Sequence, residues 1–218
     1  MHVFYTRIVA HLPVNRYEAL LSLLPKEMQQ KNRRFLQWTD RQLHLAGKLL
    51  LLEALQRFGF NSQCLRQLRY NAYNRPFINE HIDFNISHSG NYVLCAIGQQ
   101  LKVGIDIEEI RPVNFSDFEN VMTSAEWESI NHSPDPLKCF YKYWTIKESV
   151  IKADSRGLGI PLTDIQIQPG FAQLDAQTWH LQELLIDDHY CASVATDSIC
   201  ENIHVTYLKP YVTSVPLF

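Results

Sequence analysis

The sequence lacks the features that mark a secreted, membrane or nucleic-acid-binding protein. Its five cysteines are scattered, odd in number and never form a C-x-x-C pair, so they indicate neither a disulfide framework nor a zinc site. No apolar run approaches the length of a membrane span, and the first residues show no signal-peptide pattern. The net charge of −3 argues against a general nucleic-acid binder. We therefore expect a cytoplasmic protein that binds neither membrane nor nucleic acid.

Two groups of phosphotransferase motifs are also missing. The sequence has no glycine-rich P-loop and no kinase H-R-D or D-F-G set. Its 218 residues are 46% hydrophobic and 20% charged, which suffices to bury one substantial core or two small ones. Any phosphate chemistry must therefore come from other motifs.

The first such motif is acidic and reads V-G-I-D-I-E over Val103–Glu108. Apolar and other residues alternate, which predicts a strand. Its two faces are then Val103, Ile105 and Ile107 on one side and Gly104, Asp106 and Glu108 on the other. We expect the apolar face to meet a core and the acidic face to line a cleft, where the glycine leaves space. An ordinary solvated strand face is the alternative.

The second motif reads W-T-I-K-E-S-V-I-K over Trp144–Lys152. On a helix, Trp144, Glu148 and Lys152 form one ridge, since they are four residues apart. Lys147 lies about 100° round from this ridge, so the pattern leaves its role open, and a structural role such as pairing with another acid is one interpretation. The alternative for the whole motif is an exposed helix with i, i+4 ion pairs.

The two motifs together predict a metal site. If the helix crosses the strand, Glu148 meets Asp106 and Glu108. Three converging carboxylates repel one another unless a cation lies between them, and oxygen ligands favour Mg²⁺. We therefore expect a magnesium site formed by these three acids.

A third motif, Phe84–Gly90, reads F-N-I-S-H-S-G and precedes an apolar run. Alternation followed by a Gly-Asn turn predicts a hairpin with a polar S-H-S tip. Hydroxyls and a histidine at such a tip form a natural anion cradle. A turn whose serines only bond local backbone is the alternative.

These three motifs, in this order and at this spacing, resemble those of the surfactin-type 4′-phosphopantetheinyl transferases. Further matches extend the resemblance to most of the chain. They are Lys31–Phe35, like the family's K-x-R-R-F stretch, Tyr73–Pro76, like Y-G-K-P, and Gly157–Leu162, like G-x-x-x-P-L. The resemblance implies an α+β fold of two similar α/β halves, residues 1–101 and 102–218, related by a pseudo-twofold axis with the active site in the cleft between them.

The resemblance also implies an activity. The enzyme would transfer the 4′-phosphopantetheine arm of CoA to a serine of an apo carrier protein, with Mg²⁺, and release 3′,5′-ADP. The carrier would be an acyl, peptidyl or polyketide carrier domain, and the sequence does not decide which. Asp106, Glu108 and Glu148 would hold the metal, and Asp106, Glu148 and Lys152 would be catalytic. We expect a monomer. A non-catalytic homologue is disfavoured because all three acids and Lys152 are present.

For CoA itself, the resemblance assigns five residues to binding. Ser87, His88 and Lys152 would contact phosphates, Lys31 the 3′-phosphate neighbourhood, and Arg75 the adenine side. Three positions depart from the family pattern. Met28 stands where a second lysine is common, and Leu43 and His44 stand where an arginine and a hydroxyl residue are frequent. His44 or Arg41 is then the candidate replacement.

One further segment has two interpretations. Arg111–Met122 is rich in apolar residues, which suits either a carrier-protein docking surface or a buried loop and helix.

The remaining pattern predicts the other elements. The expected helices are 16–24, 26–36, 40–58, 123–131, capped by Thr123 with Glu126, and 136–152, and Thr39 or Asp40 should begin the third. The expected strands, besides those above, are 3–9, 64–70, 77–79, 81–87, 92–97, 164–168, 178–185, 190–195 and 202–208.

Overall fold

The computed structural model describes residues 1–209, so the end of the predicted second half, residues 210–218, lies outside the described part. The helices are α1 (Val14–Leu21), α2 (Lys26–Arg33), α3 (Trp38–Arg57), α4 (Ser124–Asn131) and α5 (Pro136–Asp154). The strands are β1 (His2–Arg7), β2 (Arg69–Tyr70), β3 (Pro76–Phe77), β4 (Ile82–Ser89), β5 (Tyr92–Gln99), β6 (Val103–Glu109), β7 (Gln166–Gln168), β8 (Phe171–Leu174), β9 (Gln177–Glu183), β10 (Tyr190–Thr196) and β11 (His204–Tyr207). Short 3₁₀ helices η1 to η4 cover Cys64–Gln67, Phe115–Phe118, Gly157–Gly159 and Leu162–Asp164.

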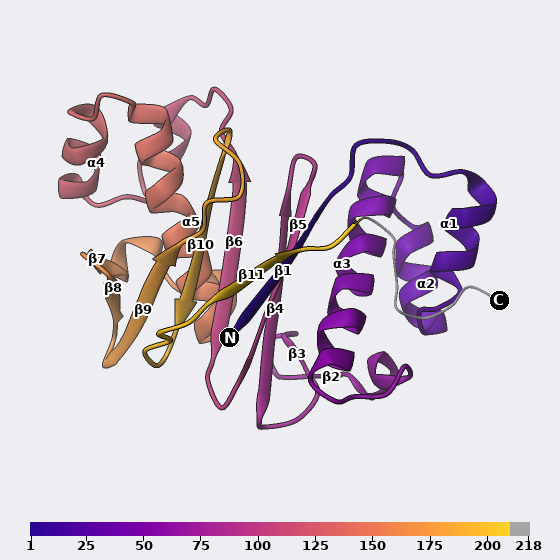
Figure 1. Cartoon of the computed structure of the whole chain (residues 1–218). Helices are drawn as coiled ribbons and strands as arrows, with labels where there is room; N and C mark the ends of the chain where they lie inside the picture. The colour runs from indigo at the N-terminus through magenta and orange to yellow at the C-terminus, as the bar shows by residue number, and fades with distance from the viewer. Residues whose placement is uncertain (210–218) are drawn as a thin grey trace.

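The strands form two main sheets between two groups of helices, which gives an α+β fold (Figure 1). The first sheet has the order β11-β1-β5-β4 and the second β6-β10-β9-β8-β7. One hydrophobic cluster joins α3 to the first sheet and another joins α5 to the second. A third cluster lies between the sheets and contains Val103, Ile105 and Ile107, together with Leu94 of β5. The predicted apolar face of the β6 strand is therefore confirmed.

The first sheet takes one strand from the far end of the chain. β11 pairs in parallel with β1, with His2 opposite His204 and Tyr5 opposite Tyr207. The predicted strand at 202–208 thus leaves the second half and crosses to the first (Figure 1).

The α3 helix differs from its prediction at its beginning. It starts at Trp38 rather than Asp40, and its N-cap Gln37 makes no side-chain capping hydrogen bond. Its buried residues begin only at Gln42 and pack against the first core, so tertiary packing stabilises the body of the helix while its first turn is exposed. The end of α3 follows the prediction, because Gly59 adopts a φ of +89° that favours glycine.

One predicted strand needs correction. Residues 64–70 form η1 and only the two-residue β2, because Cys64 and Leu65 turn inward to the first core instead of alternating.

One strand of the structure, β8, was not predicted. It lies between β7 and β9 in a three-stranded meander whose turns contain Gly170 and Asp175, both with positive φ.

The two sheets meet along β4 and β6 without main-chain pairing between these strands. Four side chains of β4 accept hydrogen bonds from alternate main-chain N–H groups of β6, and we call these four pairs the seam. They are Asp83 with Val103 at 2.8 Å, Asn85 with Ile105 at 3.1 Å, Ser87 with Ile107 at 3.4 Å and Ser89 with Glu109 at 3.1 Å. Each pair is 20 residues apart in sequence, so the two strands run parallel in one register.

The α5 helix lies directly against β6 at Gly104. A Cβ atom at this position would collide with the main-chain oxygen of Ser149 and the main-chain nitrogen of Ala153. The glycine thus clears space on the acidic face as expected, and the backbone of α5 occupies that space. This close approach brings Glu148 and Lys152 to the acids of β6.

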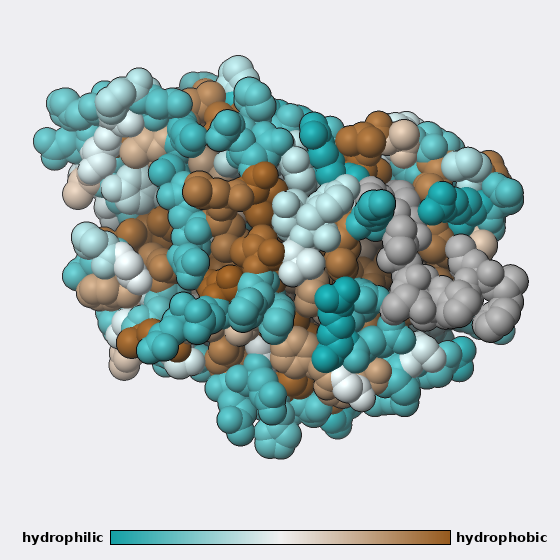
Figure 2. Space-filling model, in the orientation of Figure 1, coloured by the Kyte–Doolittle hydropathy of each residue, from teal (hydrophilic) through white to brown (hydrophobic). Residues whose placement is uncertain are grey.

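No helix of the described part of the chain is long and apolar enough to cross a membrane. Figure 2 shows hydrophobic surface over the strands near the centre of the view, surrounded by hydrophilic side chains. Most of the apolar side chains instead lie in the buried clusters.

We predict that Gly104→Ala lowers the free energy of unfolding by at least about 3 kcal/mol, because the new Cβ meets main-chain atoms that cannot rotate away. Urea denaturation measures the change. Gly159→Ala is the control, since a Cβ there meets no atom within 4 Å. It should stay within about 1 kcal/mol of wild type. Equal stability of the Gly104 variant and wild type would contradict the close approach.

Candidate active site

The centre of the candidate site is the buried carboxylate of Asp106 on β6. Lys152 of α5 donates to its Oδ1 at 2.5 Å, and Ser87 of β4 donates to the same oxygen at 2.8 Å. The other oxygen, Oδ2, is buried and has no hydrogen-bond partner. Residues from the first, second and third motifs thus meet at one carboxylate.

Two more carboxylates surround this centre. Glu108 follows Asp106 on the same face of β6, and Glu148 lies one turn before Lys152 on α5. Burial raises the pKa of all three acids. The charge of Asp106 raises the pKa of both Glu108 and Glu148 further, while Lys152 opposes the rise. Such mutual repulsion favours a bound cation.

The described residues contain no preformed group of three His, Cys, Asp or Glu side chains that could hold a metal ion. Lys152 lies against Asp106 instead, and it neutralises part of the negative charge. The donor chemistry nevertheless fits a hard divalent cation. All three side chains are carboxylates, and the unpartnered Oδ2 of Asp106 is available as a ligand.

A row of basic side chains leads away from this centre. Burial and, after it, the nearby groups Lys48, Lys31 and His88 together lower the pKa of His44 to about 4, so this histidine is neutral. Burial and the Lys31 charge also lower the pKa of Lys48. Burial and the Lys152 charge lower the pKa of His88, which links the row to the lysine at Asp106. Basic groups gathered in this way suit an extended anionic ligand.

His44 is held with one ring nitrogen free. The Asn32 amide donates to the His44 ring at 3.0 Å and to the Arg41 carbonyl at 2.8 Å, and its oxygen accepts from Tyr17. Because the Asn32 amide nitrogen is a donor, Nδ1 of His44 is the acceptor and Nε2 carries the proton. Nε2 is buried without a partner, which leaves a donor for a ligand.

Arg75 lies at the other end of the seam. Its Nη2 donates to Asp83 at 2.6 Å and to the Val103 carbonyl at 2.7 Å. The side chain is 11% exposed, so most of it serves to connect β4 with β6. Its Nη1 is buried and has no partner. The structure therefore gives Arg75 a bridging contact that the sequence did not indicate, with one nitrogen still free for the predicted adenine side.

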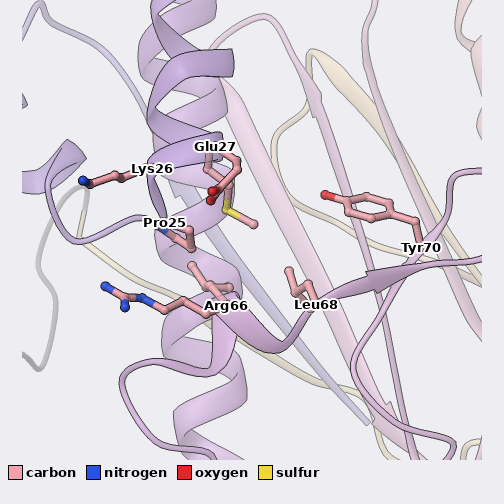
Figure 3. Close-up of a pocket in the computed structure, with 8 residues that line it drawn as sticks. Pro25, Lys26, Glu27, Arg66, Leu68 and Tyr70 are labelled. Carbon is pink, nitrogen blue, oxygen red and sulfur yellow. The ribbon is translucent and has the colours of Figure 1, made fainter.

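A hollow of about 530 Å³ lies beside α2, η1 and β2 (Figure 3). Met28 lines it together with Leu68, Tyr70 and the cations Lys26 and Arg66. None of the predicted acids, and neither Lys31 nor Lys152, lines it. A second hollow contains Lys31 and Arg34 on the adjoining surface of α2.

Lys147 of the second motif points away from the acids. Its side chain is fully buried, with Nζ 2.9 Å from Glu126 of α4 and 2.9 Å from the Leu162 carbonyl. Glu126 also accepts from the Thr123 N–H and so completes the predicted capping box. Of the roles that the sequence left open, the structure therefore shows the structural one, a pair with another acid. It ties α4 and η4 to α5.

The Arg111–Met122 segment follows its buried interpretation. Met122 is buried, and Phe115, Phe118 and Val121 pack against the cluster around Phe140. These apolar side chains therefore contribute to a core, and they do not form an exposed apolar patch.

Comparison with known proteins decides the family. A family model described as the 4′-phosphopantetheinyl transferase superfamily matches residues 102–208. A second model, for the N-terminal part of 4′-phosphopantetheinyl transferases, matches residues 13–100. The chain belongs to the 4′-phosphopantetheinyl transferase superfamily.

Curated relatives agree along most of their length. The chain is 28% identical over 219 residues to the 4′-phosphopantetheinyl transferase gsp of Aneurinibacillus migulanus, covering 96% of this chain and 92% of that protein. It is 30% identical over 205 residues to HetI of Nostoc sp., with 87% and 85% covered. With Sfp of Bacillus subtilis it shares 30% identity over 156 residues, covering 69% of each. The predicted surfactin-type resemblance and the enzyme class are thus confirmed.

Sequence reasoning missed parts of this candidate site. The motifs did not single out Lys48, which is half-buried beside Lys31 and His44. Its position ten residues into a leucine-rich helix was the available signal, because a lysine among such neighbours is rarely buried without a role. The seam had a signal as well, since β4 alternates apolar residues with oxygen-bearing side chains.

We predict that Lys147→Ala lowers the free energy of unfolding by about 3–5 kcal/mol, because it leaves the Glu126 charge buried without its partner. Urea denaturation measures the loss. Lys142→Ala is the matched control on the same helix. It removes an ion pair whose two side chains are 44% and 45% exposed, and it should cost under about 1 kcal/mol. A Lys147 variant as stable as this control would refute the structural role.

Proposed function

We propose that the enzyme transfers the 4′-phosphopantetheine arm of CoA to a serine of an apo carrier protein and releases 3′,5′-ADP, with Mg²⁺ as cofactor. The observation that supports this most is the meeting of Ser87, Asp106 and Lys152 at one buried carboxylate with an unpartnered oxygen. The names of its relatives describe the same transferase activity.

CoA would lie along the row of basic side chains. Lys31, Lys48 and the free Nε2 of His44 would hold the 3′-phosphate, and His44 would thus replace the hydroxyl residue that is frequent in the family. His88 and Lys152 continue the row and would contact the pyrophosphate. Lysine charges and imidazole N–H donors bind phosphates well, and the partly buried setting strengthens these contacts.

Asp106, Glu108 and Glu148 would hold Mg²⁺, which supplies a Lewis acid for the pyrophosphate when bound. In the transfer, the serine oxygen forms a bond to the β-phosphorus of CoA, and the bond from that phosphorus to the bridging oxygen breaks. Glu148 would accept the serine proton, because its raised pKa makes it a stronger base than an ordinary carboxylate. Lys152 would stabilise the negative charge that develops on the departing 3′,5′-ADP.

The deciding experiment incubates the enzyme with CoA, Mg²⁺ and several apo carrier proteins, and measures each carrier by mass spectrometry. We expect a mass gain of one phosphopantetheine on at least one carrier.

EDTA should stop the transfer and added Mg²⁺ should restore it. Asp106→Ala should abolish nearly all transfer with an unchanged circular dichroism spectrum, since it removes a metal ligand. Full activity in that variant, or a rate insensitive to EDTA, would exclude the proposed metal site.

The variant Lys152→Ala tests whether Lys152 takes part in catalysis or is only a surface charge. We predict a loss of about 10²-fold or more, mainly in kcat, because a contact made chiefly in the transition state affects turnover more than binding. Lys152→Arg should recover only part of the rate, since a planar guanidinium does not place its charge where the ammonium does. Steady-state kinetics with CoA measures both, with Lys142→Ala as the control. A Lys152→Ala kcat close to that of the control would end the assignment.

A further inference from the structure

The two serines of the seam, unlike Asp83 and Asn85, also donate hydrogen bonds to acids of β6. Ser87 and Ser89 each accept a hydrogen bond from a main-chain N–H of β6, and each still has its own hydroxyl proton to donate. Both protons go to acids of β6. Ser87 donates to Asp106 at 2.8 Å, and Ser89 donates to Oε2 of Glu108 at 2.7 Å.

The geometry fixes the direction of the Ser89 hydroxyl. Its oxygen accepts from the Glu109 N–H at 3.1 Å, a donor that the strand backbone holds in place. Since a hydroxyl has a single proton, that proton points to the Glu108 carboxylate. Asp106 has a second donor in Lys152, whereas no other side chain in residues 1–209 donates a hydrogen bond to the Glu108 carboxylate.

We propose that Ser89 is a positioning residue, whose hydroxyl holds the Glu108 carboxylate in the orientation that a divalent cation at the site requires. This proposal rests on the proposed function, because it concerns the same metal site. Hydrogen bonds from neighbouring groups orient metal-binding carboxylates in many proteins, and losing one typically weakens metal affinity about 10–100-fold. Ser89 itself would touch neither CoA nor the metal.

The test is a Mn²⁺ titration in the presence of saturating CoA, with free Mn²⁺ measured by electron paramagnetic resonance. Mn²⁺ is the probe because it accepts the same oxygen ligands as Mg²⁺. We expect Ser89→Ala to weaken Mn²⁺ binding at least about tenfold. Its KM for CoA at saturating metal should remain that of wild type. Ser89→Thr keeps a hydroxyl and should restore most of the Mn²⁺ affinity.

Asn85→Ala is the matched control within the seam. It leaves the Ile105 N–H without its acceptor, but Asn85 holds no acid. The variant should therefore unfold at lower urea concentration than wild type and bind Mn²⁺ as wild type does.

Two results would overturn the proposal. If Ser89→Ala binds Mn²⁺ as tightly as wild type and is destabilised like Asn85→Ala, Ser89 only joins the sheets. If Asn85→Ala weakens Mn²⁺ binding as much as Ser89→Ala does, the effect comes from the seam as a whole. If the wild-type enzyme neither transfers phosphopantetheine nor binds Mn²⁺, the proposed function itself is wrong. If the wild-type enzyme binds Mn²⁺ and Ser89→Ala binds it equally tightly, only the role of Ser89 is wrong.

Discussion

The main-chain N–H groups on the outer edge of β6 have no main-chain partner in the neighbouring strand β4, and the side chains of β4 supply their acceptors. A buried N–H without an acceptor costs about 1–3 kcal/mol, so each pair of the seam matters to the whole fold. This explains why β4 carries Asp83, Asn85, Ser87 and Ser89, residue types that strands usually disfavour. The same contacts place β4 beside the acids of β6 in a fixed register.

The site holds like charges closer together than they would lie in the unfolded chain in water. Asp106, Glu108 and Glu148 repel one another in a partly buried setting, and the charges of Lys31 and Lys48 beside His44 do the same. Lys152 offsets part of the first repulsion. The surrounding hydrophobic cores must offset the free energy that this repulsion costs. Ligands of the opposite charge would reduce the repulsion. Charged sites of this kind commonly reduce the stability of the unliganded protein.

The sequence predicted those parts that depend on neighbours along the chain. The alternation in β6, the capping box of Thr123 and Glu126, and the positive φ of Gly59 all follow from local patterns, and each is present. Contacts between distant elements could not be read in this way. The space beside Gly104 is taken by α5, and the acid that pairs with Lys147 depends on how α4 packs.

The candidate site shows the same division. Spacing and residue type were enough to single out Ser87, Asp106 and Lys152 as candidates, because each motif carried its own periodicity, but their contact at one carboxylate was not predicted. The row of basic side chains could not be predicted, because it depends on how α2 packs against α3, and no periodicity describes that packing. Arg75 illustrates the limit. Its motif was visible, but its pair with Asp83 depends on the meeting of two sheets.

The place of β11 sets the order in which the chain can complete its fold on the ribosome. β1 is made before every other strand described, yet its parallel partner β11 spans His204–Tyr207 and follows all of them. During synthesis β1 therefore keeps one bare edge until Tyr207 has emerged, and an open strand edge is prone to pair with other chains. The first sheet is thus completed only after the strands of the second sheet have been made.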